Sequence, residues 1–83
     1  MIILSQSKKG LTDDLNIKII PEIAEEIEVS GYSLINEKNI NLGFYGTEER
    51  AKEVLMEIVM KYNKSNNIYE GYVENVVYEM PEK

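Results

Sequence analysis

Residues Leu42–Tyr62, with the sequence LGFYGTEERAKEVLMEIVMKY, decide the fold of this 83-residue chain. The stretch begins as a short extended segment up to Gly46, after which Thr47 is suited to cap the first turn of a helix. Two glutamates follow, where the helix dipole favours negative charge. Apolar residues then recur at the spacing of one buried helix face, at Ala51, Val54, Leu55, Ile58 and Tyr62. We therefore predict one amphipathic helix over about residues 47–63.

Short extended segments lie on both sides of the predicted helix. The candidate strands are Met1–Leu4, Asn16–Ile20, Tyr32–Ile35, Ile40–Tyr45, Ile68–Tyr72 and Val76–Met80. Pro21 is expected to end the second of them, because proline donates no hydrogen bond to a sheet. The order of these segments predicts a single α+β domain spanning residues 1–83. An antiparallel β-meander would pack on the one helix, and one or two short strands would follow it.

Residues 22–29 fit two secondary structures. Ile23 and Ile27 have the spacing of a helical turn, whereas the alternation of Ile27 and Val29 with glutamates fits a strand. We favour the strand, with a turn at Ser30–Gly31 leading into the next strand as a hairpin.

The composition and charge exclude several classes of function. The chain has 9 basic and 15 acidic residues, for a net charge of −6, and Arg50 is its only arginine. Because nucleic-acid affinity comes from clustered lysine and arginine, direct binding of DNA or RNA is not expected. No apolar run approaches the ~20 residues of a membrane span, so we expect a cytoplasmic protein without a membrane partner. A chain this short has a small core, and association between copies is a common remedy.

Catalytic and metal-binding residues are not expected. The chain contains no histidine and no cysteine, so the usual general base, thiol nucleophile and zinc ligands are missing. Asp13 and Asp14 could offer two oxygens to Mg²⁺, but no third acidic residue is near them, and a solvated turn is the simpler interpretation. Glu25, Glu26 and Glu28 are typical of a solvated face or a guarded strand edge. No cofactor is predicted.

The two ends of the chain and the helix carry a recognisable pattern. It consists of an opening strand that ends in Ser-Gln, a Gly-x-Tyr-x-Thr-x-Glu-Arg-Ala helix entry and a closing aromatic-x-Met-Pro. The matching residues are Ser5, Gln6, Gly43, Tyr45, Thr47, Glu49, Arg50, Ala51, Leu55, Ile58, Tyr78, Met80 and Pro81. In this pattern the chain resembles a family of small uncharacterised proteins from phages and prophages of Firmicutes, whereas residues 16–40 depart from it.

The resemblance implies a phage source and action in the cytoplasm of an infected bacterium, but no assigned activity. Some small phage proteins inhibit host immunity, and a number of these sequester nucleotide signals. By this analogy we expect a non-enzymatic binding protein, most concretely an inhibitor of host defence that sequesters a nucleotide-derived immune signal. Two alternatives remain open: an acidic nucleic-acid mimic that binds a host protein, and a structural or regulatory phage component.

Five residues are candidates for contact with such a ligand. Arg50 lies in the first helical turn, where its guanidinium and free N–H groups could hold a phosphate or carboxylate. An ion pair with a glutamate of a neighbouring strand is the alternative for this side chain. Lys8 and Lys9 could add positive charge, and Tyr69 and Tyr72 could stack on a nucleobase or contact a partner.

Three apolar residues of the predicted helix fall outside its buried face. Met56 and Met60 lie four residues apart on the far side, and Val59 lies between the two faces. A methionine pair at this spacing suits a second helix packing there. We therefore predict a homo-oligomer with Met56, Val59 and Met60 in its interface.

Overall fold

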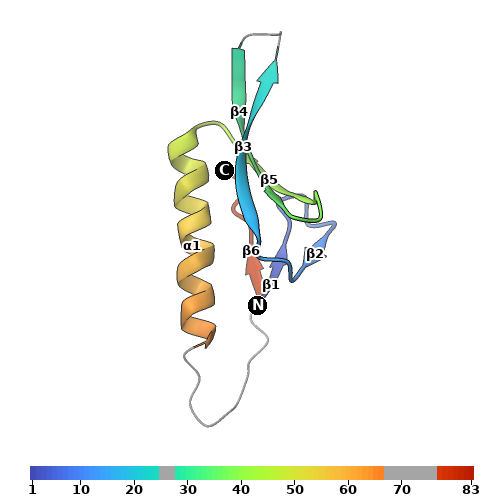
Figure 1. The fold of residues 1–83 in the computed structure, drawn as a ribbon, viewed down its shortest axis with the longest axis vertical. Helices are drawn as coiled ribbons and strands as arrows, with labels where there is room; N and C mark the ends of the chain where they lie inside the picture. Colours follow the sequence, from blue (N-terminus) through green and yellow to red (C-terminus); the bar gives the residue numbers. More distant parts are fainter. Residues whose placement is uncertain (25–27, 67–76) are drawn as a thin grey trace.

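The computed structural model describes residues 1–24, 28–66 and 77–83, and the side chains of all of these except 64–66. Its elements are β1 (Ile2–Leu4), β2 (Leu11–Thr12), β3 (Ile17–Ala24), β4 (Glu28–Asn36), β5 (Asn41–Tyr45), α1 (Glu48–Asn66) and β6 (Val77–Glu79). The predicted α+β class is confirmed, with one long helix lying beside the strands (Figure 1).

The described strands form two three-stranded sheets instead of the single meander expected. One sheet is the predicted antiparallel meander, with the order β3-β4-β5, and α1 contacts all three of its strands. The other has the order β2-β1-β6, in which β1 pairs antiparallel with β2 and parallel with β6. The parallel pairing joins segments from opposite ends of the sequence, which no local pattern can indicate.

The core lies between α1 and the two sheets. Its buried apolar residues are Ile3, Leu34, Leu42, Tyr45, Ala51, Val54, Ile58 and Met80. Gly43 lets the backbone of β5 approach this core closely, because a Cβ there would lie 3.0 Å from the Tyr45 hydroxyl and 3.2 Å from the Met80 methyl group. The predicted cap is confirmed, since Thr47 Oγ1 accepts a hydrogen bond from the N–H of Arg50 at 3.1 Å.

Two predictions about β3 and β4 are wrong. Pro21 does not end its strand but lies inside β3, which is tolerated because β3 is an edge strand of its sheet. Ser30–Gly31 is not a turn, because both residues lie within β4. Gly31 allows close packing there, because a Cβ would overlap the ring of Phe44 and lie 2.8 Å from the main-chain oxygen of Tyr45. The strand interpretation is confirmed at both ends of residues 22–29, and residues 25–27 lie outside the described part.

The helix and its surroundings differ from the prediction at the C-terminal end. Helix α1 continues to Asn66 instead of ending near residue 63. Tyr62, expected in the core, is 39% exposed, because it lines an open hollow beside β3. The predicted strand at Ile68–Tyr72 lies outside the described residues, and the following one is confirmed as β6.

Candidate functional site

Gln6 joins the N-terminal turn to the outer edge of β5. Its main-chain N–H donates to Leu42 O at 2.7 Å. Its side-chain Oε1 accepts from Phe44 N at 2.8 Å, and its Nε2 donates to Phe44 O at 3.1 Å. One residue therefore pairs with β5 as a short neighbouring strand would, and it connects the two sheets.

The same amide also holds the segment Pro81–Lys83, which we call the tail. Gln6 Nε2 donates to the main-chain oxygens of Pro81 at 3.0 Å and of Glu82 at 2.8 Å. An amide nitrogen has only two hydrogens, so its contacts with three acceptors are shared. The hydroxyl of Tyr45 donates to the Pro81 oxygen at 2.8 Å.

Two cations reach the tail from other elements. Arg50, in the first turn of α1, donates from Nε to the main-chain oxygen of Lys83 at 2.9 Å. Lys8 Nζ lies 3.8 Å from a carboxylate oxygen of Glu82. We call Gln6, Lys8, Tyr45 and Arg50 the donor cradle, because all four direct hydrogen-bond donors or positive charge at the oxygens of the tail.

The guanidinium of Arg50 also faces carboxylates of its own helix. Its Nη1 lies 3.4 Å from Glu53 Oε2 and 3.9 Å from Glu57 Oε1. The guanidinium carbon lies 6.0 Å from the centre of the Tyr45 ring, which adds a weak cation–π contact. The expected alternative, an ion pair with a strand, is therefore replaced by pairing within α1. These contacts are partly exposed, with 31% of the Arg50 side chain accessible, so each is worth ~1 kcal/mol or less.

Two tyrosines near Arg50 remain neutral at physiological pH. Burial raises the pKa of Tyr45 to about 12, because the phenolate would lose its hydration. Burial also raises the pKa of Tyr78, whose hydroxyl donates to Glu57 Oε2 at 2.6 Å. Both side chains therefore act as hydrogen-bond donors and contribute no charge.

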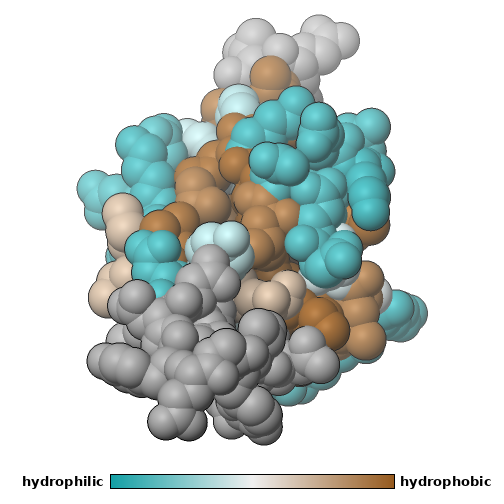
Figure 2. Space-filling model, turned by 60° about the horizontal axis from the view of Figure 1, so that its bottom comes forward, coloured by the Kyte–Doolittle hydropathy of each residue, from teal (hydrophilic) through white to brown (hydrophobic). Residues whose placement is uncertain are grey.

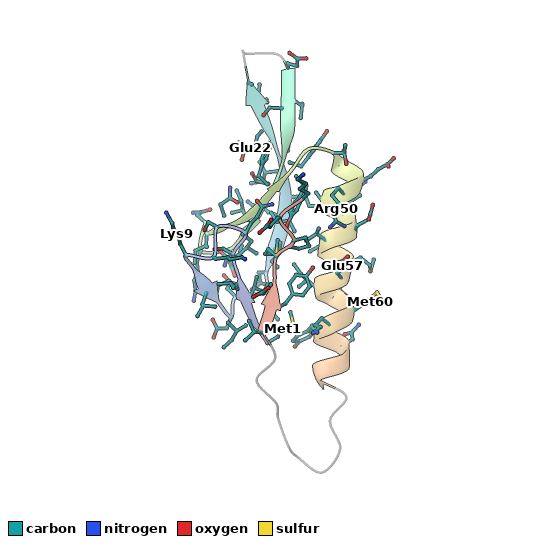
Figure 3. The ribbon with its side chains drawn as sticks, turned by 180° about the vertical axis from the view of Figure 1, so that it is seen from behind. Met1, Lys9, Glu22, Arg50, Glu57 and Met60 are labelled. Atoms are coloured by element: carbon teal, nitrogen blue, oxygen red, sulfur yellow. The ribbon has the colours of Figure 1, made fainter. Side chains whose placement is uncertain are left out.

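The structure brings two of the predicted ligand residues together. Arg50 and Lys8 both contact the tail, although 42 positions separate them in the sequence. Lys9 is exposed in the N-terminal turn, on the side of the molecule away from Arg50 (Figure 3). Tyr69 and Tyr72 lie outside the described residues. Sequence analysis missed Gln6 as a functional candidate, because an uncharged residue in a turn has no signature of its own; only the Ser-Gln of the resemblance pointed to it.

A second surface lies along the seam between α1 and β3. A hollow of about 230 Å³ is lined by Leu15, Asn16, Ile17, Leu55, Ile58, Val59 and Tyr62, and we call it the groove. Figure 2 shows a band of apolar surface bordered by hydrophilic residues on this side of the molecule. Beyond the groove, α1 exposes Met56 by 58%, Val59 by 44% and Met60 by 56%. We call these three residues the helix strip.

The part of the chain that the structure describes contains no group of three or more acidic residues able to hold a metal ion. Within the same residues, no helix is long and apolar enough to cross a membrane. Comparisons of the chain with protein-family models, curated proteins and solved structures found no match.

Proposed function

We propose that this chain acts by binding and not by catalysis, as a phage-type inhibitor of host defence that sequesters a nucleotide-derived signal. The observation that supports this most directly is the donor cradle, in which side chains from three separate segments converge on one row of oxygen atoms. Guanidinium, ammonium, amide and phenol donors are also the groups that hold phosphate and ribose oxygens.

In the proposed function the tail occupies the place that an anionic ligand takes. Main-chain oxygens of the tail and the carboxylate of Glu82 satisfy the cradle in the free protein. A phosphate group offers more charge than a peptide oxygen and forms stronger hydrogen bonds with Arg50. A ligand binds only if its bonds to the cradle are stronger in total than the contacts that it displaces, which include those of Arg50 with Glu53 and Glu57.

Isothermal titration calorimetry with a panel of cyclic and ADP-ribose-type nucleotides tests this function. We expect the protein to bind at least one nucleotide, and we expect that nucleotide to be recovered chemically unchanged after incubation with the protein. Arg50→Glu should lose this affinity. Lys38→Glu makes the same charge change in an exposed loop residue away from the cradle and is the matched control. Absence of binding by the whole panel, or equal binding by Arg50→Glu, contradicts the proposal. Metal-dependent turnover that is lost in Asp13→Ala would contradict its non-enzymatic part.

An acidic row on α1 supports a second candidate, a mimic of nucleic acid that binds a host protein. Glu49, Glu53 and Glu57 are exposed and lie four residues apart, or about 6 Å along the helix axis. Arg50 offsets part of the charge of Glu53 and Glu57, and the row presents the remaining negative charge at regular spacing to a basic protein surface. Capture of a nucleic-acid-binding host protein, released by added DNA and abolished in Glu49→Gln with Glu53→Gln, would favour this candidate.

A further inference from the structure

The tail follows a buried residue and is itself largely exposed. Met80, directly before it, is 4% exposed, and its N–H donates to Leu4 O at 3.0 Å. Beyond Pro81, both Glu82 and Lys83 are exposed, and Lys83 lies beside the first turn of α1 (Figure 1). Pro81 has no N–H that could pair with a neighbouring strand. The tail can therefore leave the cradle by rotation at Pro81 while β6 and Met80 stay in place.

The tail is held through its acceptor groups. Among the residues that the structure describes, neither Glu82 nor Lys83 donates a hydrogen bond to another main-chain group. The main-chain oxygens of the tail accept instead from side chains of the cradle. The Lys8 and Glu82 side chains are 59% and 78% accessible, so their ion pair is weak. A segment held in this way opens more readily than β6, which is paired in a sheet.

We propose that the tail is a built-in competitor of the ligand, which closes the donor cradle in the free protein and moves out at Pro81 when the ligand binds. This inference rests on the function proposed above and adds a regulatory step at the same site. The apparent affinity of a ligand then equals its affinity for the open cradle multiplied by the fraction of molecules in which the tail is open. Substitutions in the tail should therefore change the affinity although all four donors are unchanged.

The double variant Pro81→Gly with Glu82→Gln weakens closure and leaves the cradle residues in place. Glycine gives the open tail more conformational freedom than proline, and glutamine removes the charge that pairs with Lys8. Each change should favour the open tail by about 2–5-fold, so the affinity should rise roughly 4–25-fold. Glu79→Gln is the matched control, because it makes the same charge change in an exposed residue of β6, on the other side of the buried Met80.

Isothermal titration calorimetry with the nucleotide panel and with inorganic pyrophosphate, at one ionic strength, measures the effect. Pyrophosphate has no nucleoside and therefore reports on the donors alone. We expect tighter binding by the double variant than by the wild type, and wild-type affinity in Glu79→Gln. Equal binding by the double variant and the wild type overturns the competition and leaves the proposed function standing. So does an equal rise in Glu79→Gln, because charge alone would then account for it. Absence of binding by every protein overturns the proposed function and the competition with it.

Nuclear magnetic resonance relaxation of the main-chain amides of Glu82 and Lys83 observes the tail directly. In the free wild type we expect these amides to be as ordered as that of Met80. Saturation with the ligand should make both mobile on the nanosecond timescale and leave Met80 unchanged. In the double variant their mobility should rise without any ligand. A tail that is already mobile in the free wild type, or that stays ordered in the ligand-bound protein, overturns the proposal.

Discussion

Replacing Gln6 by alanine should destabilise the protein more than any other substitution in the N-terminal turn. The change removes three donor contacts, which share the two hydrogens of Nε2, and one accepted bond, and it leaves the main-chain bond to Leu42 in place. Most of these bonds are exposed, so water replaces part of each, and about 0.5 kcal/mol per bond is appropriate. The expected loss is therefore about 2 kcal/mol in the free energy of unfolding. For a domain of this size it corresponds to a fall in Tm of roughly 8–16 °C.

Urea denaturation followed by circular dichroism measures this loss, with all variants at one protein concentration because association would shift the midpoint. Lys9→Ala is the control, since this exposed neighbour should change stability by less than about 0.5 kcal/mol. Gln6→Glu keeps the acceptor but faces the carbonyl oxygens with a carboxylate, so it should be more harmful at neutral pH than in acid. A loss below about 0.5 kcal/mol in Gln6→Ala would refute the assigned role of this amide.

Three further predictions concern single side chains. Gly31→Ala should cost about 1–3 kcal/mol in unfolding free energy, because its Cβ would lie 2.8 Å from a main-chain oxygen of β5, whereas Gly46→Ala, with open space around it, should be close to neutral; urea denaturation compares the two. Tyr78→Phe should cost about 1 kcal/mol by removing the bond to Glu57. In the wild type the raised pKa of this phenol stabilises the fold below pH ~10. The stability should fall as the pH rises from there toward the pKa of Tyr78 in the folded protein, and ultraviolet titration of the phenols measures that pKa. Asn36→Ala should cost about 2–3 kcal/mol in thermal or urea unfolding, because this fully buried amide hydrogen-bonds three neighbours.

The parts of the fold that depend on local patterns could be predicted from the sequence. The spacing of Ala51, Val54 and Ile58 predicts the helix and its buried face, and Thr47 predicts where it begins. The strands β3, β4 and β5 follow one another in the chain and pair in that order, as sequential strands commonly do.

The parts that depend on contacts between distant residues could not be predicted. The parallel pairing of β1 with β6 joins Ile2 to Val77 and Leu4 to Glu79, and no local pattern indicates a contact between residues so far apart in the sequence. Ser30–Gly31 between two extended segments favours a hairpin turn, whereas the role of Gly31 in the structure is set by the ring of Phe44 on the next strand. Pro21 favours a strand end because proline donates no hydrogen bond to a sheet, whereas the edge position of β3, which tolerates it, is a property of the assembled sheet.

The candidate site likewise has residues that could be predicted from their type and an arrangement that only the folded structure shows. Arg50 and Lys8 could be selected by residue type, since cations are the expected partners of an anion. Their common contact with the tail, and the amide of Gln6 between them, arise only when three separate segments meet. The exposed helix strip could be predicted because its position follows from helical geometry alone, but the adjoining groove requires the position of β3.

The bond between Gln6 and Pro81 also affects how the protein is made, because 75 positions separate the two residues. A ribosome adding about 5–20 residues per second needs roughly 4–15 s to cover that distance. Throughout this interval the nascent chain holds β1 without its parallel neighbour, and the edge of that strand is open to pairing with other chains. The pairing of β1 with β6 closes a loop of similar length, so this step is slow compared with the formation of α1. The most aggregation-sensitive interval in the synthesis of this fold is therefore the one before β6 is made, and a chaperone that covers β1 during those seconds should raise the yield of folded protein.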